Sequence, residues 1–138
     1  MKSQKTNSKS QIKSNSQSSK NEHRPKYDLE ERTFEFAKAV RLFVKTLPNT
    51  LANLEDSKQL VRSSGSIGAN YIEANESLSK KDFVMRIKIS RKEAKESVYW
   101  LKMISETNDL KNSGEAQYLI QEATELKKIF SAILLKSM

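Results

Sequence analysis

Three pairs of glutamates have the spacing that brings two carboxylates to one face of a helix, where they could bind Mg²⁺. The pairs are Glu73 with Glu76, Glu93 with Glu96, and Glu122 with Glu125. All-α nucleotide pyrophosphohydrolases hold magnesium with related E-x-x-E patterns, so a magnesium-dependent nucleotide hydrolase is one hypothesis. No further phosphate-binding motif accompanies the pairs, Glu76 falls near a predicted helix end, and the middle pair has lysine neighbours. Salt-bridged structural carboxylates are therefore the favoured interpretation, with no bound metal.

A second pattern is a row of lysines near heptad spacing, called here the lysine stripe: Lys81, Lys88, Lys92, Lys95 and Lys102. Its members fall on one side of a predicted helix, away from the apolar side. In one interpretation the stripe is a solvated face on which Glu93 and Glu96 pair with Lys92 and Lys95. In the other it binds the phosphates of RNA or DNA without reading bases. The solvated face is favoured for a single chain, whereas ring assembly would favour phosphate binding through multivalency.

Other catalytic chemistry lacks the residues that it needs. His23 is the only histidine and the chain has no cysteine, which argues against di-iron Glu-x-x-His sites, Ser/His or Cys/His nucleophiles and thiolate metal sites. The three glycines form neither a P-loop nor a dinucleotide fingerprint. We predict a protein that is not an enzyme and needs no cofactor.

Four amphipathic segments must position these residues. Apolar side chains recur at steps of four and three over residues 29–47, from the Pro48-Asn49 turn to about residue 75, from Ser79 to the Asn108-Asp109 break, and after Gly114. Asp28 and Ser79 have the side chains of helix N-caps, and no window alternates as a strand would. Four long helices joined by short turns predict an all-α, antiparallel, up-and-down four-helix bundle.

The second segment contains an unusual stretch, Ser63 to Asn75. Its core-facing seam is Leu60, Ser64, Ile67, Tyr71, Ala74 and Leu78, and beside it runs a second row, Val61, Gly65, Gly68 and Ile72. Each glycine inside a helix costs roughly 1 kcal/mol relative to alanine, so a compensating contact is expected. We predict that a neighbouring helix, of the same bundle or of another subunit, approaches closely along the second row.

The opposite flank of this segment is polar and consists of Gln59, Ser63, Ser66, Asn70 and Glu73. We predict interhelical polar contacts for Ser66, Asn70 and Glu73, with Arg62 or a lysine of the third helix as the partner of Glu73. Tyr99 and Trp100 are adjacent, so they point in different directions around the third helix. One could enter the core while the other contacts another subunit, and the pair alone is no sign of base stacking.

Composition separates a tail from the folded part. The formal net charge is +8, but residues 1–26 contain seven basic residues and one acidic residue, which leaves only +2 for residues 27–138. The segment 1–26 is almost entirely Lys, Ser, Gln and Asn, so we predict a disordered basic tail, either a solubilising extension or a salt-sensitive tether to phosphates. No apolar run could span a membrane and no secretory signal is present, so we expect a cytoplasmic protein without membrane contact.

The order of several motifs resembles the bacterial four-helix-bundle family of 23S rRNA intervening sequence proteins. The resemblance covers roughly residues 27–135, and the motifs that carry it are Tyr27 to Arg32, Gln59 to Ser63, Ser66 to Ala74, Ser79 to Phe83, Lys92 to Glu96, and Trp100-Leu101. It implies a left-handed bundle and assembly into homopentameric rings. A similar bundle is the accessory subunit of reverse transcriptases in diversity-generating retroelements, where a positively charged pentamer contacts nucleic acid and the polymerase.

Three functional hypotheses follow. The leading one is a self-associating scaffold or accessory protein with weak, sequence-independent affinity for RNA or DNA. The second is a protein-binding adaptor that docks onto a polymerase or another retroelement enzyme. The magnesium-dependent nucleotide hydrolase is the third.

Overall fold

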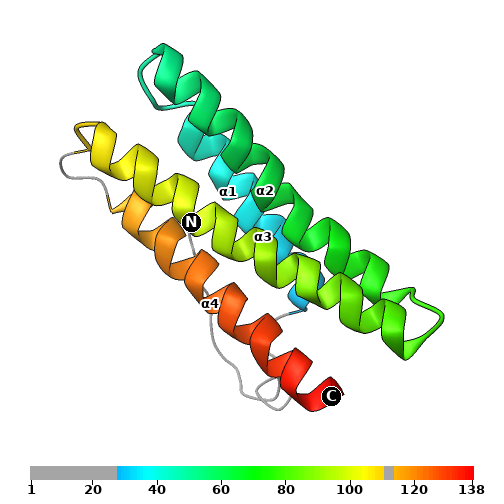
Figure 1. Cartoon of the computed structure of the whole chain (residues 1–138). Coiled ribbons are helices and arrows are strands. Elements are labelled where there is room, and N and C mark those ends of the chain that lie inside the picture. Colours follow the sequence, from blue (N-terminus) through cyan, green and yellow to red (C-terminus); the bar gives the residue numbers. More distant parts are fainter. Residues whose placement is uncertain (1–27, 111–113) are drawn as a thin grey trace, which may run out of the picture.

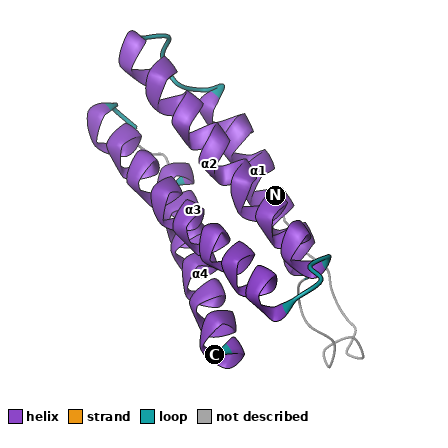
Figure 2. Cartoon of the chain, turned by 45° about the vertical axis from the view of Figure 1, so that its right-hand side comes forward, coloured by secondary structure: helices purple, strands orange, loops and turns teal. Residues whose placement is uncertain are grey.

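The chain forms four helices that run alternately up and down. The computed structural model describes residues 28–110 and 114–138, so the predicted tail at residues 1–26 lies outside the described residues. The helices are α1 (Leu29–Val44), α2 (Leu51–Asn75), α3 (Lys80–Thr107) and α4 (Glu115–Ser137). Figure 1 shows their antiparallel arrangement, and Figure 2 shows only helices and loops in the described part. The prediction of an all-α four-helix bundle is confirmed.

Side-chain caps explain where three of the helices begin. Asp28 accepts a hydrogen bond from the Glu30 amide at 3.0 Å, and Ser79 accepts one from the Asp82 amide at 3.0 Å, at the two positions that the sequence identified. Thr50 caps α2 in the same way, through the Asn53 amide at 3.1 Å. The sequence pattern had not singled out this third cap.

The first helix is shorter than its apolar pattern predicts. The α-helix ends at Val44, whereas we expected it to continue to residue 47. The chain tightens there: the Thr46 and Leu47 amides donate to carbonyls three residues back, at 3.0 and 3.3 Å. Such a turn of narrower helix is common just before a proline, and Pro48 follows.

The predicted apolar seams form the core. Its largest fully buried side chains come from all four helices and include Val40, Leu60, Ile67, Leu101 and Phe130. Each helix packs on its two neighbours, so that α1 lies diagonally opposite α3. Leu78 is the exception to the predicted seam, because α2 ends at Asn75 and this side chain is 100% exposed in the following turn.

The two glycines of α2 face α1 of the same chain. A Cβ atom at position 68 would lie 2.8 Å from Thr33 Oγ1, and one at position 65 would lie 3.2 Å from Arg41 Nη2. Val61 is partly buried on this side and Ile72 is 48% exposed. The close approach predicted for the second row therefore occurs within the bundle, and its use between subunits remains a prediction.

Small polar groups join α2 to α3 inside the bundle. The hydroxyls of Ser63 and Ser97 are 2.8 Å apart and both residues are fully buried. At one end, Asn53 and Asn108 each donate an amide hydrogen bond to the other, at 2.8 and 2.9 Å. Hydrogen bonding removes the cost of burying these polar atoms and sets the register of the two helices. Among the described residues, no helix has the length and apolarity of a membrane span.

Candidate nucleic-acid interface

The positive charge of the bundle is concentrated on α3. This helix carries eight basic and four acidic residues, a net charge of +4. The other three helices are each neutral or within one charge of neutrality, as their sequences show. One helix therefore supplies the basic excess of the described part of the chain.

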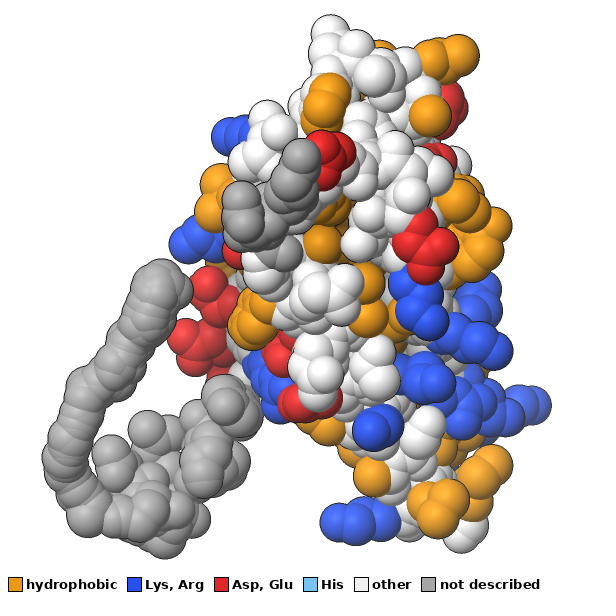
Figure 3. Space-filling view, turned by 90° about the vertical axis from the view of Figure 1, so that its left-hand side faces the viewer, with side chains coloured by type: hydrophobic (Ala, Val, Ile, Leu, Met, Phe, Trp, Pro, Cys, Tyr) orange, Lys and Arg blue, Asp and Glu red, His pale blue; other side chains and the backbone are white. Residues whose placement is uncertain are grey.

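The side chains of the lysine stripe all lie on the exposed side of α3. Lys81, Lys88, Lys92, Lys95 and Lys102 are exposed, and so is Lys80 at the start of the helix. None of these six forms an ion pair with another described residue. Figure 3 shows Lys and Arg side chains gathered along the right-hand edge of the molecule, which faces forward in Figure 1, where α3 runs.

The acidic residues next to the stripe are bound by a different helix. Arg62 of α2 places Nη2 at 2.6 Å from Glu96 Oε2 and at 3.3 Å from Glu93 Oε1. The expectation that Glu93 and Glu96 pair with Lys92 and Lys95 was wrong. The reason is geometric, because Glu93 is 5% exposed and turns toward α2, where the long arginine side chain reaches it.

These contacts shift two pKa values. Partial burial by itself raises the pKa of Glu96, but hydrogen bonds from Arg62 and Trp100 and the charges of Arg62 and Lys92 outweigh it, and the pKa is lowered. The hydrogen bond to Glu96 is the main reason why the pKa of Arg62 is raised. The carboxylate and the guanidinium therefore stabilise each other's charged forms.

We use the name arginine clamp for an arginine that binds both carboxylates of an E-x-x-E pair on a neighbouring helix, as Arg62 does with Glu93 and Glu96. A second arginine clamp joins α1 to α4. Arg32 donates from Nε to Glu122 Oε2 at 2.7 Å and from Nη2 to Glu125 Oε1 at 2.9 Å. The hydrogen bond from Gln121, and then that from Arg32, lower the pKa of Glu125. Two of the three E-x-x-E pairs thus bind an arginine of the neighbouring helix, which supports the structural interpretation of these carboxylates over the magnesium one.

The third pair and the polar flank of α2 are arranged differently. Glu73 is exposed, and its side chain has no hydrogen bond or ion pair with the described residues. The contact that we expected with Arg62 does not form in the single chain, because Arg62 is bound to α3. Asn70 accepts a hydrogen bond from Arg86 of α3 at 2.9 Å, and Ser66 contacts Asn70 on its own helix at 2.9 Å.

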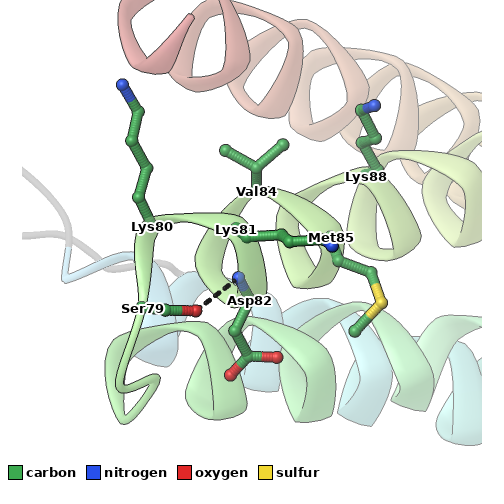
Figure 4. Close-up of a pocket in the computed structure, with 7 residues that line it drawn as sticks. All are labelled: Ser79, Lys80, Lys81, Asp82, Val84, Met85 and Lys88. Atoms are coloured by element: carbon green, nitrogen blue, oxygen red, sulfur yellow. Dashed lines mark hydrogen bonds between the residues drawn. The ribbon is translucent and has the colours of Figure 1, made fainter.

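A surface hollow continues the stripe at the start of α3. It has a volume of about 730 Å³ and is lined by the first turns of that helix, including Lys80, Lys81, Val84, Met85 and Lys88. Figure 4 shows Lys80, Val84 and Lys88 projecting from one side of the helix, at steps of four residues. Three lysines and two apolar side chains among the lining residues, against the single carboxylate of Asp82, suit a ligand that is anionic and partly apolar.

Two aromatic residues lie in contact near the C-terminal end of the stripe, between Lys95 and Lys102. The rings of Tyr99 and Trp100 have centroids 4.9 Å apart and planes at 84°, an edge-to-face arrangement. Trp100 is partly buried against the core, while Tyr99 is 55% exposed. Trp100 Nε1 also donates to Glu96 Oε2 at 3.2 Å. The expectation that one ring enters the core fits Trp100.

Sequence reasoning missed both arginine clamps and the accessibility of Tyr99. The E-x-x-E spacing was the available signal for the clamps, since two carboxylates on one helical face can bind one guanidinium as readily as a metal. For Tyr99 the signal was its position four residues after Lys95 and three before Lys102, on the stripe's own face.

The fold and this surface define a class: small all-α, up-and-down four-helix bundle proteins with one basic helix face. Within that class, the chain belongs to the 23S rRNA-intervening sequence protein family, whose model matches residues 26–132. The resemblance drawn from the sequence motifs is thereby confirmed. No curated protein matches the chain.

A solved structure has the same fold. It is the crystal structure of a protein of unknown function from the S23 ribosomal protein family of Bacteroides thetaiotaomicron VPI-5482. The TM-score is 0.70 and the identity is 32%, over 78% of this chain and 98% of that chain. The similarity therefore covers the bundle. Because the function of that protein is unknown, the function of this chain has to be inferred from its own surface.

Proposed function

We propose that the protein is a non-enzymatic, self-associating accessory protein of the cytoplasm that binds RNA or DNA through the lysine stripe of α3, with little sequence preference. The name of its family refers to an rRNA, which makes RNA the first ligand to test. Contacts between lysines and phosphates carry no base information, so the affinity should be weak for one chain and strongly salt-dependent.

One observation carries this proposal: the acidic neighbours of the stripe are bound by Arg62. On a face of alternating paired charges, Glu93 and Glu96 would form ion pairs with the lysines, but both form them with Arg62 of α2, and only the longer-range charge of Lys92 acts on Glu96. The ammonium groups are free of ion pairs within the described residues and can bind phosphates without first breaking salt bridges. Binding would then release counterions from the nucleic acid, which is the main source of favourable free energy for such complexes.

Self-association is supported by apolar side chains exposed near the boundary of α1 and α2. Leu54 and Ile72 lie on the same side of α2 as Gly65, and Phe34 of α1 is 64% exposed. Burying such side chains between copies would be favourable. In a homopentamer, the arrangement implied by the sequence resemblance, five stripes would act together and raise the effective affinity.

The nucleic-acid proposal is tested with two matched charge reversals in the full-length chain. The test variant is Lys88→Glu with Lys95→Glu, and the control is Lys38→Glu with Lys45→Glu. The control has the same charge change and the same spacing of seven residues, on exposed positions of the diagonally opposite helix α1 and its C-cap. Filter binding with single-stranded RNA and DNA across a salt series gives affinity and slope.

We expect the test variant to bind more weakly and to have a salt slope that is shallower by about 0.7 for each phosphate of a single strand that it no longer neutralises. The control should keep most of the wild-type affinity, and circular dichroism should show unchanged helicity in both. Equally weakened binding by the two variants would mean that net charge alone matters, and unchanged affinity in the test variant would refute the surface. A further variant with serine at the lysines of residues 1–26 measures the contribution of the tail.

Oligomeric state is measured by size-exclusion chromatography with light scattering. Each chain is 15.8 kDa, so a pentamer corresponds to five times that mass, or 79 kDa. A strict monomer at all concentrations would refute self-association and the multivalent part of the proposal.

The protein-binding adaptor is the second candidate, and the same exposed apolar residues of α1 and α2 favour it. It would be preferred if the protein associates but binds neither RNA nor DNA.

A further inference from the structure

We propose that Tyr99 is a stacking platform for an unpaired base, so that the lysine stripe selects single-stranded over double-stranded nucleic acid. The inference rests on the proposed function, because it names the class of ligand that the same surface takes. It uses two observations that the charge argument does not: the exposure of the ring and the way in which its neighbours hold it.

The ring is placed among the ammonium groups. Lys95 precedes Tyr99 by four residues and Lys102 follows it by three, which are the spacings of nearest neighbours on a helix surface, with Cβ atoms about 5–6 Å apart. Lys92 lies two turns earlier on the same side, about 10.5 Å along the helix axis. A backbone that runs along these lysines therefore passes directly over the tyrosine.

Contacts with neighbouring side chains also fix the orientation of the Tyr99 ring. Tyr99 meets Trp100 edge to face, Trp100 donates to Glu96, and Glu96 accepts from Arg62 of α2 at 2.6 Å. This series of contacts ties the exposed ring to the interface of two helices. A ring that is already oriented loses less conformational entropy when a base stacks on it.

Stacking separates two ligands that lysines alone would treat alike. In a duplex the bases are stacked on one another inside the helix, whereas a single strand can present a base face to an aromatic side chain. Ammonium groups bind the phosphates of both forms. A preference for single strands therefore has to come from a group such as Tyr99.

The test uses the full-length protein and fluorescence anisotropy with two probes, a single-stranded oligouridine and an RNA duplex that carries the same number of phosphates. Tyr99→Ala should weaken binding of the single strand by about 5–10-fold, near the low end of the range for removal of one stacked base. Binding of the duplex and the salt slope on both probes should stay at the wild-type values. Tyr99→Phe, which keeps the ring, should bind within about twofold of wild type.

Tyr118→Ala serves as the matched control, because Tyr118 is also an exposed tyrosine, 58% exposed, but lies on α4 and not on α3. It should bind both probes as the wild type does. Trp100 is the only tryptophan, so its fluorescence in the unaltered protein gives a second measurement. We expect its emission to change on adding the single strand and to change much less on adding the duplex.

The outcomes distinguish this inference from the proposed function. If Lys88→Glu with Lys95→Glu weakens binding but Tyr99→Ala does not, stacking is refuted and phosphate binding stands. Equally weakened binding of single strand and duplex by Tyr99→Ala would also refute stacking. If the wild type binds neither probe, the proposed function itself fails. If Tyr99→Ala lowers the melting temperature, Tyr99→Leu and the Trp100 emission still test stacking. Leucine keeps apolar bulk but offers no aromatic face, so Tyr99→Leu should also bind the single strand more weakly.

Discussion

The Oγ1 atom of Thr33 lies 2.8 Å from the point that a Cβ atom of Gly68 would occupy. The single proton of that hydroxyl is shared, within its own helix, between the carbonyl oxygens of Leu29 and Glu30, at 3.0 Å each. These hydrogen bonds hold Thr33, which is 1% exposed, in one rotamer, and the missing side chain at position 68 is what allows α1 to approach α2. Gly65 is different, because the group above it is the flexible end of Arg41.

The two glycines should respond in opposite ways to alanine. Gly68→Ala gains about 1 kcal/mol of helix propensity but meets Thr33 at a distance that forces a shift, and such overpacking costs about 1–3 kcal/mol. We expect a net destabilisation of up to about 2 kcal/mol, measured by urea unfolding at one protein concentration. Gly65→Ala should be neutral or stabilising, since Arg41 can move aside. A destabilisation by Gly65→Ala as large as that by Gly68→Ala would contradict the assigned difference.

The Arg62 clamp predicts a non-additive pair of substitutions. Arg62→Met leaves the buried Glu93 without its partner, which should destabilise the protein by about 1–3 kcal/mol. Adding Glu93→Met removes the unpaired charge, so the double variant should recover most of the stability. Urea unfolding of the wild type, both single variants and the double variant gives the coupling free energy. If the changes in unfolding free energy of the two single variants add up to that of the double variant, the coupling free energy between Arg62 and Glu93 is zero.

The lowered pKa of Glu96 predicts a pH dependence with a definite sign. Near its ordinary pKa of 4.5, the unfolded chain binds more protons at this site than the folded chain does. Stability from Glu96 is therefore complete above that value and is lost as the pH falls from about 5 through the folded pKa. Glu96→Gln should show a smaller decrease of stability on acidification than the wild type, by at most about 1 kcal/mol for so exposed a partner.

Thermal melts at a series of pH values below neutrality measure this difference. Glu76→Gln is a suitable control, because Glu76 is an exposed carboxylate whose side chain has no ion pair among the described residues. Identical acid sensitivity of Glu96→Gln and the wild type would show that this carboxylate is not stabilised by its partners.

The reciprocal amide pair predicts a coupling between the ends of α2 and α3. Asn53 is buried and exchanges hydrogen bonds with Asn108, so a double-mutant cycle with alanine at both positions should give a coupling of about 1 kcal/mol. The exposed contact from Asn75 to Glu30, at 2.9 Å, offers a control cycle in which we expect almost no coupling. Similar values in both cycles would mean that burial does not strengthen the first pair.

Local features of the fold were open to prediction from the sequence. Apolar periodicity located all four helices, and Asp28 and Ser79 were identified as N-caps. These features depend on interactions within about one helical turn, which spacing along the chain reports directly. We predicted that the first helix ends at residue 47 and that Leu78 belongs to the core, because apolar periodicity continues through both positions. The regular α-helical hydrogen bonds end earlier, at Val44 and Asn75.

The functional surface was only partly predictable. Spacing placed the lysine stripe on one side of the helix, but it could not tell which partner Glu93 and Glu96 would choose. That choice depends on α2 lying beside α3 and on the reach of Arg62, which are properties of packing between segments some 30 residues apart.

The sequence by itself therefore determined four helices, their apolar seams and a row of lysines on one of them, because each follows from the 3.6-residue repeat. Tertiary structure decided that α1 lies over Gly68 and that Arg62, and no lysine of the stripe, forms the ion pairs with Glu93 and Glu96. It also decided that Tyr99 stays exposed and that its ring is held by an edge-to-face contact with Trp100. Those outcomes depend on which helices become neighbours and how far their side chains reach, and periodicity within one helix carries no information about either.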